Sequence, residues 1–162
     1  MRFGILTISD RSFRNERPDT SGPALEKAVI SHGWQVVKTE IIPDEIEFIK
    51  IKLIEWSDSE QLDILLTTGG TGFSPRDVTP DATRSIIERF TPGLDEAMRA
   101  ASLLVTPHAM LSRAISGIRK RTIIINLPGS PKGAVENMQV IAPVLEHATQ
   151  LLNEDPRSEK GH

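Results

Sequence analysis

The sequence predicts an α/β domain built on a mostly parallel central sheet. Three short runs rich in β-branched residues, 3–9, 63–68 and 122–127, are apolar almost throughout. Strands have this composition when helices cover both faces of a parallel sheet. Residues 34–42 alternate more between apolar and polar side chains, which predicts a strand nearer the edge. Helical patterns separate these runs, as is typical of the α/β class.

The first three helices are predicted from apolar spacing and from their end signals. One is expected to follow residues 21–23 and to end at Gly33. The next covers residues 46–56, where apolar side chains recur at spacings of three, four and three. A third begins with Thr79 as its N-cap and Pro80 in its first turn. The core-facing side chains of this third segment are expected to be Ile86, Ile87 and Phe90.

Two further helices complete a single domain. They are expected from about Leu94 and from about Lys132, with Pro143 kinking or dividing the last one. The chain of 162 residues fits one domain, which we place at residues 1–152. Residues 153–162 are expected to form a polar, flexible tail.

Composition excludes several classes of function. The chain has no cysteine, which rules out disulfide scaffolds, zinc fingers, iron–sulfur sites and thiol nucleophiles. The net charge of −3 argues against a sequence-independent coat on nucleic acid. No apolar segment approaches the length that crosses a bilayer, and the apolar start is too short for a signal peptide. We therefore expect a cytoplasmic protein with no membrane or nucleic-acid partner.

The charges are distributed unevenly along the chain. Residues 1–96 hold 11 basic and 17 acidic side chains, residues 97–135 hold six and none, and residues 136–162 hold two and five. A cationic middle segment in an acidic protein suggests where an anionic ligand binds. The sequence therefore predicts that residues 97–135 supply positive potential to phosphate groups.

Candidate ligand-binding loops follow the strands at their carboxyl ends, where α/β sheets bind ligands. Glycines let successive backbone N–H groups surround an anion, and nearby hydroxyls add donors. One such loop is more often a simple turn, but two on one sheet edge favour a phosphate site. Neither loop is a Walker motif or a dinucleotide fingerprint. The candidate residues are Ser9, Asp10, Thr68, Gly69, Gly70, Thr71, Gly72, Asn126, Pro128, Gly129 and Ser130.

Two aspartates and one lysine have more than one interpretation. Asp77 follows the glycine loop and is either a Mg²⁺ ligand or a turn residue that bonds its own backbone. Asp44 is placed as the N-cap of the helix over 46–56, with Glu47 completing a capping box. Lys132 is a phosphate contact or a solvated lysine in a first turn. The four histidines lack metal-ligand spacing, so a zinc site is not expected.

Residues 67–83, which run from the glycine loop through Asp77 to the start of the next helix, resemble the signature of a known family. It is the molybdopterin adenylyltransferase family of the MogA type, which includes the G domain of gephyrin and the matching domain of plant molybdenum-cofactor proteins. The resemblance covers nearly the whole chain in order. It continues through residues 6–10, 19–22, 43–45, 110–113, 117–119 and 125–131.

The resemblance implies a three-layer α/β/α fold, MogA/MoaB-like, that assembles as a homotrimer. It implies transfer of AMP from ATP to the phosphate of molybdopterin with Mg²⁺ as cofactor, and a MoeA-type enzyme as partner. Asp44 and Asp77 match the family's catalytic aspartates and are candidate Mg²⁺ ligands, which overrides the N-cap interpretation of Asp44. Ser102 and Ser112 match segments near the pterin site.

A MoaB-like relative of the same fold offers the main alternative, a carrier or scaffold that binds molybdopterin without adenylylating it. Such relatives often lack both aspartates, whereas this sequence keeps Asp44 and Asp77. The active adenylyltransferase is therefore the favoured prediction.

Overall fold

The computed structural model describes residues 1–154, so nearly all of the expected tail, from 155 onward, lies outside the described residues. The strands are β1 (Arg2–Ile8), β2 (Gln35–Ile42), β3 (Ile64–Thr68), β4 (Arg89–Phe90), β5 (Ser116–Arg119) and β6 (Thr122–Leu127). The helices are α1 (Asp10–Phe13), α2 (Ser21–Ser31), α3 (Ile46–Asp58), α4 (Thr79–Ile86), α5 (Pro92–Leu103), α6 (Pro131–Leu152) and the 3₁₀ helix η1 (Pro107–Leu111).

One sheet with the order β2-β1-β3-β6-β5-β4 runs through the described part of the chain. The pairs from β2 to β6 are parallel, and β5 and β4 are added antiparallel at one end. The predicted mostly parallel sheet is confirmed, and the strand predicted nearer the edge is the edge strand β2. The strands β4 and β5 were not predicted from the sequence, because both are short and neither contains an extended apolar run.

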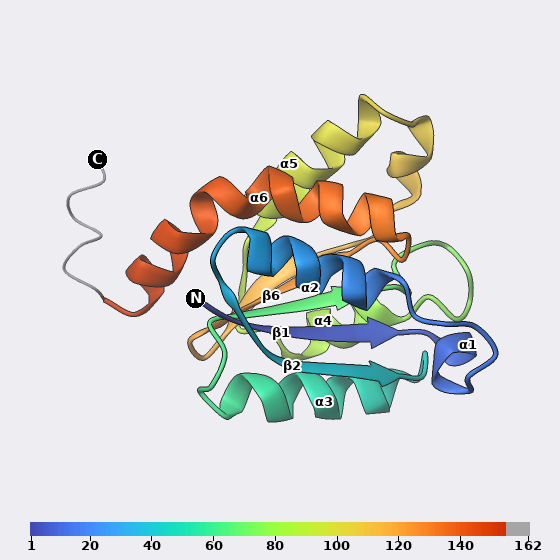
Figure 1. The fold of residues 1–162 in the computed structure, drawn as a ribbon, viewed down its shortest axis with the longest axis horizontal. Helices are drawn as coiled ribbons and strands as arrows, with labels where there is room; N and C mark the ends of the chain where they lie inside the picture. The colour runs from blue at the N-terminus through green and yellow to red at the C-terminus, as the bar shows by residue number, and fades with distance from the viewer. Residues whose placement is uncertain (155–162) are drawn as a thin grey trace.

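Helices cover both faces of the sheet, which gives three layers (Figure 1). One apolar cluster joins Phe3 and Ile5 of β1 to α2, α5 and α6. The other joins Leu6 and Ile8 of the same strand to α3 and α4. Side chains of β1 therefore enter opposite cores, which explains why the strand is apolar almost throughout.

Three local predictions need correction. Thr79 is not an N-cap: it lies in the first turn of α4, and its buried hydroxyl donates to the Gly69 carbonyl over 2.9 Å. Phe90 is 53% exposed and lies outside the core, because β4 is an edge strand. Pro143 does not divide the last helix, since α6 continues from Pro131 to Leu152. For Thr79 and Phe90, a tertiary contact and an edge position outweighed the local pattern.

The order in which strands are added to the sheet reverses between the parallel neighbours β1 and β3. From β1 the chain crosses to β2 at one edge, whereas from β3 it crosses to the other half of the sheet. Ligands of α/β sheets bind at such a reversal, beyond the carboxyl ends of the strands. No helix within residues 1–154 is long and apolar enough to span a membrane.

Candidate active site

A cavity of about 720 Å³ opens at the carboxyl ends of β1, β3 and β6. It lies between β1 and β3, where the strand order reverses, and open α/β sheets bind their ligands at such a point. Nine of the residues predicted from sequence line it, and they come from four separate loops. They are Ser9, Asp10, Asp44, Thr68, Gly69, Gly70, Asp77, Gly129 and Ser130. We call this space the polar cavity.

The loops of the polar cavity approach one another closely at Gly69. A side chain there would place Cβ 2.2 Å from the Ile8 carbonyl oxygen, and Gly69 has a φ of 105°. Only glycine meets both conditions. The Thr68 hydroxyl donates to the Pro128 carbonyl over 2.7 Å, so its proton already joins the two glycine loops. The Ser9 and Ser130 hydroxyls cap α1 and α6.

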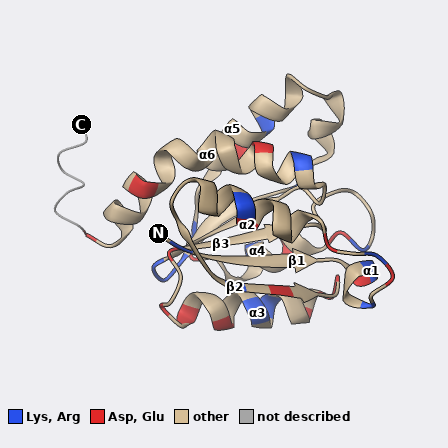
Figure 2. Cartoon of the chain, viewed as in Figure 1, with Lys and Arg blue, Asp and Glu red and all other residues tan. Residues whose placement is uncertain are grey.

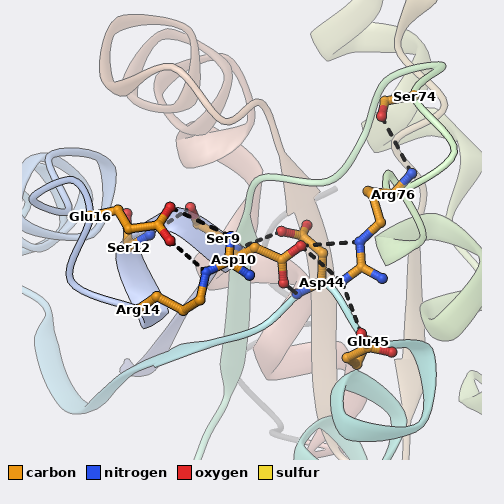
Figure 3. Close-up of polar contacts among 9 residues, drawn as sticks. All are labelled: Ser9, Asp10, Ser12, Arg14, Glu16, Asp44, Glu45, Ser74 and Arg76. Atoms are coloured by element: carbon orange, nitrogen blue, oxygen red, sulfur yellow. Dashed lines mark hydrogen bonds and ion pairs between the residues drawn. The ribbon is translucent and has the colours of Figure 1, made fainter.

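Asp44 and Asp10, which both line the polar cavity, are joined by two reciprocal hydrogen bonds (Figure 3). The Asp10 backbone N–H donates to Asp44 Oδ2 over 2.7 Å, and the Asp44 N–H donates to Asp10 Oδ1 over 3.1 Å. The predicted capping box is therefore wrong, because Glu45 is the N-cap of α3 and makes no side-chain cap. The Asp44 carboxylate instead fixes the end of β2 against the end of β1.

The carboxylates around Asp44 form a region of concentrated negative charge. Burial raises the pKa of the Asp44 carboxyl, and the charges of Asp10 and Asp77 add to that rise, although the Asp10 N–H opposes it. Arg76 offsets part of this charge by donating to Asp10 Oδ2 over 2.8 Å and to Glu45 over 2.9 Å (Figure 3). A half-buried carboxylate with a raised pKa in a cleft is a functional-site candidate.

The donor set fits a Mg²⁺ ion that is completed by phosphate oxygens. Asp44 Oδ1 and Asp77 Oδ1 accept no hydrogen bond from any other residue between 1 and 154, which leaves both free for a cation. Glycines at 70 and 72 admit these carboxylates, since a Cβ would meet Asp44 Oδ1 at 3.1 Å and Asp77 Oδ2 at 2.8 Å. No group of three or more metal-ligating side chains occurs in the described residues. Mg²⁺ commonly takes only one or two carboxylates beside substrate phosphates.

A second cavity of about 310 Å³ adjoins the first and shares Ser130 with it. Apolar side chains from α5 and the following segment, among them Met98, Val105 and Leu111, line it together with polar groups. We call it the apolar cavity. The remaining predicted site residues lie here: Thr71, Gly72, Ser102, Ser112, Asn126 and Pro128. The structure thus divides the predicted residues between two adjoining cavities.

Asn126, near the end of β6, is fully buried between the sheet and the apolar cavity. Its amide nitrogen donates to the Thr67 hydroxyl over 2.9 Å and to the Thr83 hydroxyl over 3.0 Å. Its oxygen accepts from the Ile115 N–H. Every polar group of this side chain is used within the protein, so its role here is to join β3, β6 and α4.

The cationic groups of the polar cavity are not those expected from the sequence. Its lining arginines are Arg11 and Arg17, around α1, and the region shows both basic and acidic residues in Figure 2. None of the basic side chains of residues 97–135, which were predicted to supply the positive potential, lines this cavity, whereas Arg99 of that segment lines the cavity that adjoins it. Lys132 is exposed and pairs loosely with Glu136 at 3.8 Å, as a solvated first-turn lysine does.

Arg11 was missed although the rule that located Ser9 and Asp10 also applies to it. It follows them directly at the end of the first apolar run. Arg17 lies further along the same loop and carried no local signal. Neither arginine makes an ion pair with another of the described residues, which leaves both available to an anion.

Asp95 lines the apolar cavity, and its Oδ1 atom is buried without a hydrogen-bond partner. Burial raises the pKa of its carboxyl, although hydrogen bonding to Ser116 and the charge of Arg99 oppose this. A raised folded-state pKa favours the protonated form, so ionised Asp95 lowers stability as the pH rises through that value.

We therefore expect Asp95→Asn to raise the Tm near neutral pH, with the gain vanishing below about pH 4, where Asp95 is protonated in both states. Thermal unfolding across this pH range measures the effect, and Glu96→Gln, at an exposed neighbouring position, is the control. A Tm for Asp95→Asn that is equal to or below wild type at neutral pH contradicts the assignment.

The fold and the paired cavities define a class of protein. Residues 4–147 match the family model described as a probable molybdopterin binding domain. The chain is also 42% identical over 142 residues to the molybdopterin adenylyltransferase of Escherichia coli K12, covering 86% of this chain and 72% of that protein. The chain belongs to the molybdopterin adenylyltransferase family, which is a family of nucleotidyltransferases.

Other relatives extend this comparison. The chain is 44% identical over 157 residues to the molybdenum cofactor synthesis protein cinnamon of Drosophila melanogaster, covering 94% of this chain. It spans only about a quarter of the length of cinnamon and of Dictyostelium discoideum gephyrin, 26% and 23%. The names of these relatives place the family in molybdenum cofactor biosynthesis.

Two solved structures share the whole fold. MoaB of Thermus thermophilus, titled a molybdopterin biosynthesis enzyme, is 50% identical with a TM-score of 0.89, covering 96% of this chain and 98% of that chain. A MogA structure is 34% identical with a TM-score of 0.88, covering 94% and 99%. The predicted three-layer MogA/MoaB-like fold is confirmed.

Proposed function

We propose that this chain transfers AMP from ATP to the phosphate of molybdopterin and releases pyrophosphate. The observation that carries the proposal is the pair of adjoining cavities that share Ser130. The polar cavity, with its glycine loop and two arginines, suits a polyphosphate. The apolar cavity suits a pterin, since small-molecule sites are mostly apolar with a few convergent polar groups.

In this mechanism the molybdopterin phosphate is the nucleophile. One of its oxygens attacks the α-phosphorus of ATP, a bond forms between them, and the bond from that phosphorus to the oxygen bridging to the β-phosphate breaks. Pyrophosphate leaves with the electron pair. The protein then needs to position two polyanions and neutralise their charge, and it needs no nucleophile of its own. This agrees with the lack of cysteine.

Each part of the polar cavity has a task in this reaction. Backbone N–H groups of residues 70–72, which run from the polar into the apolar cavity, and of the α6 N-terminus bind phosphate oxygens, whereas the Gly69 N–H already donates to the Leu127 carbonyl. Arg11 and Arg17 bind the β- and γ-phosphates that leave together. Asp44 and Asp77 would hold Mg²⁺, which when bound supplies charge neutralisation to the ATP phosphates. Ser130, shared by the two cavities, marks the side on which the two substrates meet.

Two further parts of the proposal concern assembly. We propose a homotrimer, which is supported by exposed apolar side chains after α5, among them Leu104 at 90% and Val105 at 65% exposure. We also propose that the product passes to a MoeA-type enzyme in the cytoplasm. Both follow from the family resemblance and stay predictions.

Pyrophosphate release tests the activity. We expect release only when ATP, Mg²⁺ and molybdopterin are all present, with each omitted in turn as control. A carrier or scaffold that binds molybdopterin without adenylylating it gives no pyrophosphate in the complete mixture, and that result contradicts the proposed function. Pyrophosphate release from ATP without molybdopterin also contradicts it, since water would then accept the adenylyl group and the second product would be AMP.

A further inference from the structure

Arg113 lies between the segment that lines the apolar cavity and the loop that carries Asp77, and it lines neither cavity. It follows η1, and its neighbours Ser112 and Ala114 line the apolar cavity. Its own side chain turns away from that cavity toward the loop that carries Asp77. The sequence predicted for it only a share in the positive charge of residues 97–135.

The side chain of Arg113 binds both ends of the loop formed by residues 72–77 and links them to α4. Its Nε donates to the Gly72 carbonyl over 2.9 Å, and its Nη2 donates to the Asp77 carbonyl. The guanidinium also pairs with the Asp81 carboxylate, at 3.1 and 2.9 Å. The Arg113 backbone N–H donates to the Thr71 carbonyl over 2.8 Å. A planar fork of donors is needed to make all these side-chain contacts at once.

Between these anchors the loop has one other side-chain support, Arg76, which pairs with Asp10 and Glu45 from an exposed position. Residues 73–76 are exposed, and Phe73, its one large apolar side chain, is 67% exposed. Within the loop, the Ser74 N–H donates to Asp77 Oδ2 over 2.9 Å, so the carboxylate moves with its own backbone. The place of Asp77 in the polar cavity therefore depends on its anchored carbonyl and on the solvent-exposed ion pairs of the neighbouring Arg76, of which the carbonyl contact acts on Asp77 itself.

We propose that Arg113 is a positioning residue that holds the Asp77 carboxylate in its working place relative to Asp44. The inference rests on the proposed function, since it assumes that Asp77 acts on the bound nucleotide. A misplacement of about 1 Å at a reacting centre can cost roughly 100-fold in rate. Loss of Arg113 is therefore expected to lower kcat far more than it changes the KM for ATP.

The test compares Arg113→Met and Arg113→Lys with Arg119→Met. Arg119 makes a similar ion pair, with Asp58 at 2.7 Å, and lies outside both cavities. We expect Arg113→Met to lower kcat about 100-fold, to change the KM for ATP less than about threefold, and to speed hydrogen exchange at residues 74–78 at least about threefold. Arg113→Lys should share the loss of kcat, because an ammonium cannot reach all these acceptors. Arg119→Met should leave kcat and exchange in the loop unchanged.

Hydrogen exchange keeps this inference separate from the proposed function. If wild type releases no pyrophosphate, the proposed function fails. Hydrogen exchange at residues 74–78 in the ligand-free protein still tests whether Arg113 stabilises the loop. Wild-type exchange at residues 74–78 in Arg113→Met contradicts the inference. Should that variant not fold, Arg113→Lys decides it, because wild-type kcat in the lysine variant overturns the positioning role.

Discussion

Asp77→Asn and Asp44→Asn are each expected to lower the single-turnover rate of AMP transfer at least about 100-fold while the protein stays folded. Both carboxylates line the polar cavity with one oxygen free, and the amide keeps their shape without their charge. Removing one charge also relieves repulsion, because Asp77 contributes to the raised pKa of the Asp44 carboxyl. The Tm of either variant should therefore not fall much, which separates lost chemistry from lost folding.

The measurement is rapid-quench detection of adenylylated molybdopterin with enzyme in excess. Asp58→Asn is the matched control, since Asp58 pairs with Arg119 at the far end of α3 and lines neither cavity. We expect it to turn over at the wild-type rate. Full activity in both cavity variants contradicts a mechanism that depends on the two aspartates. Lost turnover with retained molybdopterin binding supports it.

Gly69→Ala is expected to destabilise the fold by about 3 kcal/mol or more. The residue has a φ of 105°, and the added Cβ would lie 2.2 Å from the Ile8 carbonyl oxygen, which is backbone and cannot rotate away. The ends of β1 and β3 would have to separate, and the polar cavity would deform with them. For a chain of this size such a loss lowers the Tm by roughly 6–12 °C.

Thermal unfolding measures this change, with Gly93→Ala as control. Gly93 lies in the first turn of α5 with no atom near the position of its Cβ, so alanine there should leave the Tm unchanged or slightly higher. A Gly69→Ala protein with the wild-type Tm contradicts the close approach of the two strand ends.

Much of the fold could be predicted because burial on both faces leaves a direct trace in composition. The strands β1, β3 and β6 are continuous apolar runs, and all three were found. The hairpin strand β5 was not, since residues 116–119 are only four, the first two buried and the last two partly exposed, and they carry no such run. The antiparallel end of the sheet depends on contacts between β4, β5 and β6, which periodicity does not record.

The candidate site could be predicted where it follows strand ends and could not where distant segments meet. Loops after β1, β3 and β6 were found by position alone. Asp44 satisfied a local capping pattern, but its contact with Asp10 across 34 residues determines its place. The charge of a segment was also misleading, because Arg11 from the acidic first part lines the polar cavity and Lys132 does not.

The most direct test of the central claim follows the α-phosphate of ATP in a single turnover. Enzyme in excess over molybdopterin is mixed with Mg²⁺ and ATP labelled at the α-phosphorus. The proposed function predicts that the label becomes covalently attached to the molybdopterin phosphate, with one pyrophosphate released for each pterin. Molybdopterin that stays bound and unlabelled, with ATP intact, would show that the paired cavities carry the pterin without adenylylating it, and the account would be contradicted.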